Sequence, residues 1–142
     1  MPPVALIDTG AIIAIVNADD RYNLPCIEAL RSLHAPLSTT EVVLTELFHL
    51  IHARGFRMDK AWAFVRSGAL ELKTIGDDDL PQLNALMEDY ADRPMDFADA
   101  TLVHLAGREQ ISTILTVDHD DFETYRLPGR KKFRVLPARA RN

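Results

Sequence analysis

Residues 4–11 read VALIDTGA, an apolar run that ends in an aspartate and continues into small residues. The continuous run Val4–Ile7 is typical of a strand that is buried on both faces, as in a parallel sheet. Asp8 follows at the carboxyl end of this strand, and Ala11–Val16 is predicted to begin a helix. A buried strand that passes directly into a helix is the repeating unit of an α/β fold.

The rest of the chain continues this alternation. Apolar residues at helical spacing predict further helices that begin at Asp19, Thr39 or Thr40, Asp59, Asp77 and Asp96. Extended segments are predicted at residues 36–38, 70–75, 111–117 and 133–136, with a loop over most of 118–132. This order predicts an α/β three-layer α/β/α sandwich with a mainly parallel central sheet.

Length and composition exclude several classes of protein. The chain has 142 residues, of which 47% are hydrophobic, so we expect a single domain over residues 1–142. Its apolar runs, such as Ala11–Val16, are far shorter than the ~20 residues of a membrane helix, and Met1–Pro3 does not begin a signal peptide. The single cysteine, Cys26, excludes an internal disulfide. We therefore expect a cytoplasmic protein without a membrane segment.

Charge is unevenly distributed along the chain. The formal net charge is −5, yet residues 126–142 carry seven basic residues and no acidic one. The first 125 residues hold the other nine basic and all 21 acidic residues, a formal charge of −12. This basic C-terminal segment is interpreted either as a solvated tail or as a contact for phosphates or an acidic partner.

Two aspartates follow predicted strands. Asp8 comes directly after Val4–Ile7, and Asp118 after Ile114–Val117. Each is also a favoured helix-capping residue when considered alone. Because ligands in open parallel sheets bind beyond the carboxyl ends of the strands, the pair indicates a site at that edge.

Three further acids lie on predicted helices. Asp96 and Asp99 are three residues apart, so they share one helix face, although both also suit helix capping. Glu46 lies in the middle of a helix on its apolar side, between Val43 and Leu50. Acids seldom occupy such a position unless they are paired, and no lysine or arginine lies nearby in the sequence.

These acids are predicted to meet in one cleft. Carboxylates held that close together cannot all remain ionised without compensation, and a hard divalent cation compensates them. Oxygen ligands suit Mg²⁺ or Mn²⁺ rather than zinc. Such a cleft hydrolyses phosphate esters with a metal-activated water.

Four segments carry a resemblance to a known family. They are residues 6–11 (LIDTGA), residues 40–47 with Glu46, residues 95–100 (MDFADA), and residues 116–118 (TVD) with Asp121 and Phe122 after them. In this order and spacing the chain resembles the PIN-domain ribonucleases, and among them the VapC-type toxins of bacterial toxin–antitoxin pairs. The resemblance extends from end to end of the chain.

The resemblance implies an acidic cleft that binds Mg²⁺ or Mn²⁺ and cleaves RNA as an endoribonuclease. It further implies inhibition by a cognate antitoxin protein and, in most members, a homodimer. By position, the core acids would be Asp8, Glu46, Asp99 and Asp118, with Asp96 as an accessory metal ligand.

Supporting roles are also implied by the resemblance. Thr9 and Thr116 would orient the cleft through their hydroxyls. The run His119–Asp121 departs from the family, in which many members carry basic residues here, so Asp121 is left either as a helper in metal or phosphate binding or as an acid that disfavours RNA.

Two other functions remain open at this point. One is a metal-dependent phosphohydrolase of a small substrate, although the D-x-D of haloacid-dehalogenase-type phosphatases is replaced here by Asp8–Gly10. The other is a catalytically inert module that keeps the fold and binds RNA or protein. A missing core acid would favour this module, and all four are present.

Overall fold

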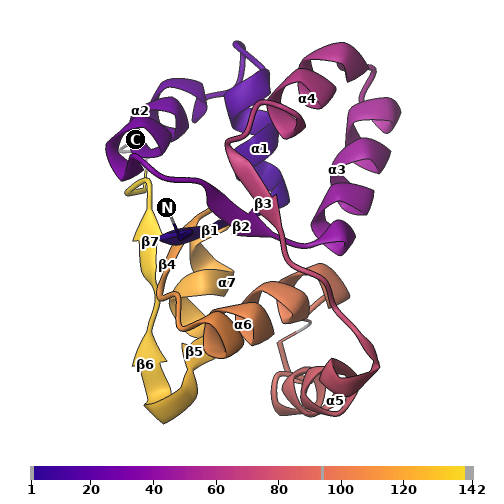
Figure 1. The fold of residues 1–142 in the computed structure, drawn as a ribbon, viewed down its shortest axis with the longest axis vertical. Coiled ribbons are helices and arrows are strands. Elements are labelled where there is room, and N and C mark those ends of the chain that lie inside the picture. The colour runs from indigo at the N-terminus through magenta and orange to yellow at the C-terminus, as the bar shows by residue number, and fades with distance from the viewer. Residues whose placement is uncertain (1, 94, 140–142) are drawn as a thin grey trace.

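Five parallel strands form the centre of the molecule, in the order β3-β2-β1-β4-β7 (Figure 1). The computed structural model describes residues 2–93 and 95–139. The strands are β1 (Ala5–Ile7), β2 (Leu37–Thr39), β3 (Leu70–Leu72), β4 (Thr113–Leu115) and β7 (Arg134–Leu136). All four neighbouring pairs are parallel, with Leu6 beside both Ser38 and Ile114.

Helices cover this sheet. They are α1 (Thr9–Val16), α2 (Asn23–Leu33), α3 (Glu41–Ala53), α4 (Met58–Val65), α5 (Leu80–Asp89), α6 (Phe97–Glu109) and α7 (His119–Thr124). A 3₁₀ turn, η1 (Asp77–Asp79), precedes α5. In Figure 1, α1 to α4 gather in the upper half of the view, and α5 and α6 lie in the lower half, with the strands between them. The predicted α/β architecture with a parallel central sheet is confirmed.

The sheet reverses its strand order beside β1. The chain proceeds from β1 outward through β2 to β3, then returns to place β4 on the other side of β1. Connections therefore leave the carboxyl ends of β1 and β4 in opposite directions, and a crevice opens between them. The residues that follow these two strands are positioned to line it.

Burial explains why apolar and polar residues do not alternate along β1. Ala5, Leu6 and Ile7 are fully buried, because helices cover both faces of the sheet at this central position. Val4 is 45% exposed, so the strand begins one residue later than the apolar run. The same burial applies to Ile114 and Leu115 on β4, the partner strand.

Several predicted boundaries were wrong for identifiable reasons. The helix expected from Asp19 begins at Asn23, because the Asp20 carboxylate accepts a hydrogen bond from the Tyr22 backbone N–H and holds a turn there. The expected loop contains α7 and a small antiparallel hairpin of β5 (Arg126–Leu127) and β6 (Lys131–Lys132), joined by η2 (Pro128–Arg130).

The basic C-terminal segment is thus folded over most of its length. Its hairpin packs on α6, and β7 completes one edge of the sheet, which rules out a wholly solvated tail. One of its seven basic residues, Arg141, lies outside the described residues. Within the described ranges, no helix has the length and apolarity needed to cross a bilayer.

Candidate active site

The two strand-end aspartates are tied together by one threonine. The Thr116 hydroxyl donates to Asp8 Oδ2 at 3.1 Å and accepts from the Asp118 backbone N–H at 3.0 Å. Asp8 also caps α1, because its Oδ1 accepts from the Thr9 N–H at 2.8 Å. Asp8 therefore caps α1 and also belongs to the site. The adjacent pairing of β1 and β4 brings these residues together.

The amino end of α6 supplies the next two acids. Asp96 is the N-cap of this helix and accepts the Asp99 backbone N–H at 2.8 Å, as the capping interpretation predicted. Asp99 is buried in the first turn, and its Oδ2 accepts a hydrogen bond of 2.8 Å from the Tyr125 hydroxyl. Asp99 is thereby fixed in orientation, whereas Asp96 remains exposed at the rim.

All five predicted acids line a single pocket of about 390 Å³. Its walls come from α1, α3, the amino end of α6 and the turn after β4. The acidic residues that line it are Asp8, Asp20, Glu46, Asp96, Asp99 and Asp118. Arg54 is the basic residue in this lining, and Glu46 reaches it from α3 as a half-buried side chain. The convergence expected from the sequence is present.

Burial makes these carboxyls hard to ionise. It raises the pKa of Asp8 to about 7, with a smaller contribution from the charges of Glu46 and Asp118. It raises the pKa of Asp99 to about 8, again with repulsion from Asp8 and Asp96. The pKa of Asp118 rises to about 6, through burial and the neighbouring Asp121 carboxyl. A pocket of this kind takes up protons or cations near neutral pH.

The donor set suits a hard divalent cation. The pocket presents carboxylate oxygens, and the Thr9 hydroxyl is buried beside them without a hydrogen-bond partner in the described part of the chain. No three Asp, Glu, His or Cys side chains within residues 2–93 and 95–139 are arranged to hold a metal ion by themselves. Mg²⁺ usually binds through one or two carboxylates and keeps several waters, so the arrangement fits that ion.

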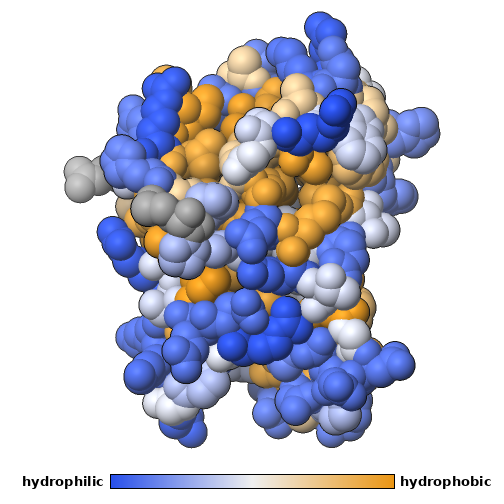
Figure 2. Space-filling view, viewed as in Figure 1, coloured by the Kyte–Doolittle hydropathy of each residue, from blue (hydrophilic) through white to orange (hydrophobic). Residues whose placement is uncertain are grey.

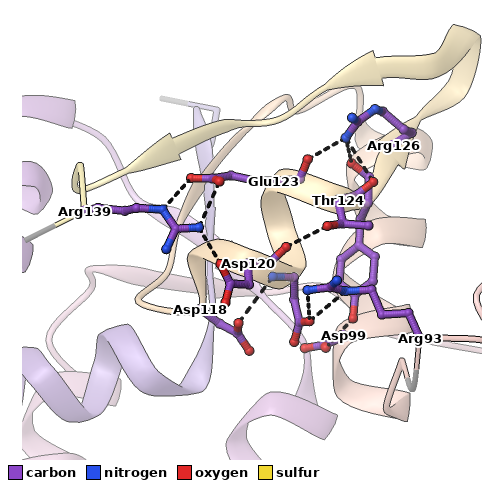
Figure 3. A network of polar contacts seen from close by, with 10 residues as sticks. Arg93, Asp99, Asp118, Asp120, Glu123, Thr124, Arg126 and Arg139 are labelled. Carbon is purple, nitrogen blue, oxygen red and sulfur yellow. Dashed lines mark hydrogen bonds and ion pairs between the residues drawn. The ribbon is translucent and has the colours of Figure 1, made fainter.

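The acids that follow Asp118 are neutralised by arginines (Figure 3). Asp121 is paired with Arg93 at 3.0 Å, and Asp120 is paired with Arg139. Arg139 also contacts Glu123 at 3.0 Å. The acids of these pairs lie on α7. Neither Asp120 nor Asp121 lines the pocket. The arginines therefore offset much of the charge of the extra acids, while the Asp121 carboxyl still raises the pKa of Asp118.

Sequence reasoning missed three residues of the site. Tyr125 lies in the segment predicted as a loop, so no periodicity marked it, and only the packing of α7 brings it to Asp99. Asp20 was interpreted as a helix start, and Arg54 follows the end of α3. No signal in the sequence distinguished Asp20, Arg54 or Tyr125, and Asp20 lies among polar residues (residues 17–23, NADDRYN).

Comparisons with known proteins find a matching family model and a similar sequence. A family model described as "PIN domain" matches residues 5–127. The chain is 32% identical over 135 residues to ribonuclease VapC26 of Mycobacterium tuberculosis, covering 93% of this chain and 99% of that protein.

Solved structures show the same fold at lower identity. VapC20 of Mycobacterium tuberculosis, a toxin that cleaves the sarcin–ricin loop, superposes with a TM-score of 0.74 at 20% identity, over 94% of this chain and 99% of that one. A toxin–antitoxin complex from Klebsiella pneumoniae gives 0.66 at 18% identity, over 94% and 96%. VapBC2 of Rickettsia felis, bound to a promoter DNA fragment, gives 0.67 at 14% identity, over 94% and 98%.

Proposed function

Because the chain belongs to the PIN-domain family, we propose that it is a divalent-metal-dependent endoribonuclease and the toxin of a toxin–antitoxin pair. The 32% identity to a ribonuclease over nearly the whole of both chains supports the activity. The observation that carries the proposal is the single pocket in which Asp8, Glu46, Asp96, Asp99 and Asp118 converge at the reversal of strand order.

Each acid has a part in the proposed reaction. One or two carboxylates of Asp8, Asp99 and Asp118 would hold Mg²⁺ or Mn²⁺ together with several waters, and the remaining acids, including Glu46 and Asp96 at the rim, would accept hydrogen bonds from those waters. When bound, the cation supplies an acidified water and neutralises charge on the scissile phosphate. Attack by water leaves a 5′-phosphate and a 3′-hydroxyl on the cleaved RNA.

Fixed neighbours prepare these carboxylates for the task. The Thr116 hydroxyl holds Asp8, and the Tyr125 hydroxyl holds Asp99, so neither carboxylate needs to reorient when the substrate arrives. Thr9 lines the pocket, and its buried hydroxyl has no hydrogen-bond partner among the described residues. Asp121 supports the site through Asp118, whose Oδ1 accepts the Asp121 backbone N–H at 3.4 Å.

The partners proposed for the protein are RNA as substrate, a cognate antitoxin and a second copy of the chain, in the cytoplasm. Two structures of similar fold are toxin–antitoxin assemblies, which supports an antitoxin. A hollow of about 560 Å³ with mainly apolar walls adjoins the acidic pocket. It includes Val42 and the 42% exposed Phe97, together with Glu46 and Asp96 of the site. A protein bound there would cover the acids.

The test is an RNA cleavage assay on purified protein freed of antitoxin. Total cellular RNA is incubated with Mg²⁺, with Mn²⁺ or with EDTA, and the cut ends are mapped. We expect cleavage that requires metal and disappears in Asp8→Asn. Asp78→Asn, which removes an exposed acid from η1, is the matched control and keeps full activity.

Two results would contradict the proposal. Cleavage that persists in EDTA, or in Asp8→Asn, would remove the metal site from the mechanism. RNA binding without cleavage in either metal would favour a module that binds RNA but is catalytically inert.

A further inference from the structure

A small hairpin carries a group of cations without partners. We define the basic hairpin as residues 126–134, which include β5, η2 and β6. Its exposed side chains Arg130, Lys131, Lys132 and Arg134 make no hydrogen bond or ion pair within the described ranges. Arg126 differs, because its guanidinium donates to three carbonyl groups at the end of α7 (Figure 3).

Other arginines near the hairpin are already neutralised. Arg93 binds Asp121, Arg108 binds Asp79, and Arg139 binds Asp120 and Glu123. The four unpaired cations therefore concentrate positive charge on a protein whose net charge is −5. Figure 2 shows a largely hydrophilic surface in the lower left of the view, where Figure 1 places β5 and β6.

Hollows lie on both sides of this hairpin. One of about 750 Å³ is bounded by α5, α6 and the hairpin, with Leu86 and Val103 in its wall and Arg130 at its edge. The other, of about 530 Å³, includes Ile111 and Lys131. Gly107, Leu127 and Pro128 belong to both linings, so the two hollows meet where the hairpin rests on α6.

Two tyrosine rings connect the first hollow to the acidic pocket. Tyr90 lines the hollow, and the Tyr90 ring contacts the Tyr125 ring edge-on at 5.1 Å between centroids. Tyr125 in turn donates its hydroxyl hydrogen to Asp99 in the acidic pocket. Along α6, the eight residues from Asp99 to Gly107 span about 12 Å. An RNA strand of a few nucleotides is long enough to span the distance from Asp99 to Gly107.

The acidic pocket alone is a poor anchor for RNA. Its carboxylates repel phosphate groups, and a bound cation compensates them only at the scissile group. Affinity for a nucleic acid comes mainly from cations that contact its phosphates, and single strands add contacts between bases and apolar or aromatic surface. The basic hairpin offers unpaired cations, and the first hollow offers the Tyr90 ring beside apolar side chains such as Leu86 and Val103.

We propose that the basic hairpin and its two hollows bind single-stranded RNA on one side of the cleaved bond, through phosphates on the cations and bases in the hollows. The inference rests on the proposed function for the identity of the nucleic acid. An acidic segment of a protein partner would also meet the cations, but the Tyr90 ring and the apolar side chains of Leu86 and Val103 in the first hollow favour an anion that carries flat, apolar groups.

The first experiment measures RNA binding without cleavage. Fluorescence anisotropy follows a labelled single-stranded RNA of mixed sequence, about 20 nucleotides long, with the full chain in EDTA. The variant is Arg130→Gln/Lys131→Gln/Lys132→Gln. We expect its Kd to rise at least about tenfold near 0.1 M salt. The slope of log K against log salt should fall by about 2, since each phosphate contact to a single strand contributes about 0.7.

A matched variant controls for net charge. Arg31→Gln/Lys60→Gln/Arg66→Gln removes the same three charges from exposed positions on α2, on α4 and just after α4. We expect this control to keep the wild-type salt slope. Equal losses in the two variants would overturn the proposal, because they would show a response to total charge and no local contact.

A competition assay separates RNA from an acidic protein segment. Unlabelled poly-uridylate is expected to displace the labelled RNA, and a polyglutamate peptide of equal charge is expected to displace it far less. If polyglutamate competes equally well, the hairpin is a general anion site and the assignment to RNA is wrong.

Cleavage of the same RNA in Mn²⁺ distinguishes this inference from the proposed function. The hairpin variant should keep kcat and show a raised KM. If the wild-type chain cleaves nothing while the hairpin variant still loses RNA binding, the nuclease function fails and the RNA site stands. If the wild-type chain cleaves RNA and the hairpin variant binds it normally, the RNA site fails and the nuclease stands.

Discussion

The Tyr125 hydroxyl donates a 2.8 Å hydrogen bond to Asp99 Oδ2, joining the end of α7 to the first turn of α6. Both residues are buried. Burial raises the pKa of Asp99 to about 8, and this hydrogen bond opposes the shift because it stabilises the carboxylate. The tyrosine therefore both orients Asp99 and favours its charged form, which is the form that binds a cation.

Replacing this tyrosine should weaken metal binding. Tyr125→Phe removes the donor and raises the pKa of Asp99 further, so the carboxylate is less often charged at neutral pH. A hydrogen bond to a charged group contributes about 1.5–3 kcal/mol, which corresponds to at least about tenfold weaker Mn²⁺ binding. Isothermal titration calorimetry measures the affinity. Tyr90→Phe is the control, because its hydroxyl contacts the Arg126 backbone N–H and no acid, and equal affinities in the two variants would contradict the prediction.

Metal-free protein should lose stability as pH rises. The folded pKa of Asp8 is about 7 and that of Asp99 about 8, both above the unfolded value of 3.8. The folded state therefore holds protons that the unfolded state has released, and the free energy of unfolding decreases with pH through this window. We expect the Tm in EDTA to fall between about pH 5 and about pH 8.

The same measurement on a variant identifies the group responsible. Asp8→Asn cannot ionise, so its Tm should fall less over this pH range, whereas the exposed-site variant Asp78→Asn should follow the wild-type curve. Added Mg²⁺ should stabilise the wild-type protein more at the upper end of the range. A Tm that is independent of pH in the metal-free wild-type protein would contradict the raised pKa values.

Gly10 is required by a close approach at the edge of the site. A Cβ at this position would lie 2.7 Å from Val117 Cγ2, which is too short for a van der Waals contact. Gly10→Ala should therefore displace Val117 and the adjacent Asp118, and overpacking of this kind costs about 1–3 kcal/mol. We expect a lower Tm and slower cleavage.

A second substitution checks this steric cause. Gly10→Ala/Val117→Ala removes the colliding methyl group and should recover part of both the Tm and the activity. If the double variant is no better than Gly10→Ala, backbone conformation, rather than the contact with Val117, accounts for the requirement.

Asp118 and Asp121 should differ sharply in their effect on cleavage. Asp118 lines the pocket, whereas Asp121 is paired with Arg93 on α7 and does not. Asp118→Asn is expected to reduce kcat by about 100-fold or more, because it weakens the site of the cation that stabilises charge developing on the phosphate. Asp121→Asn breaks a partly exposed ion pair and should change kcat by less than about fivefold. Similar losses in single-turnover assays would mean that Asp121 shares the metal.

Local patterns along the chain sufficed for the parallel sheet and for most of the acids. The strand Ala5–Ile7 lacks alternation between apolar and polar residues because both of its faces are covered, and a continuous apolar run in the sequence is the sign of such burial. Asp8 and Asp118 were recognisable because each directly follows such a run. Asp96 and one of Thr39 and Thr40 were recognisable as helix caps; the structure shows Thr40 in that role, and both Thr40 and Asp96 accept a backbone N–H.

The sequence of α7 and of the basic hairpin shows no such local pattern. The six residues of α7 are too few to show a helical period, so His119–Thr124 was predicted as a loop. The strands of the basic hairpin have two residues each, which is too short to show alternation between apolar and polar residues. The structure of these segments depends on contacts with other elements: β5 packs against α6, and α7 packs against β7.

Residue identity along the chain was therefore enough to establish which acids stand at strand and helix ends, since capping and burial act over a few residues. The packing of distant segments established what surrounds those acids. Tyr125 reaches Asp99 across 26 positions, and Arg139 reaches Asp120 across 19. A hydrogen bond between such positions depends on how α7 is placed against α6 and β7, and that placement follows from the burial of the whole core rather than from any local motif.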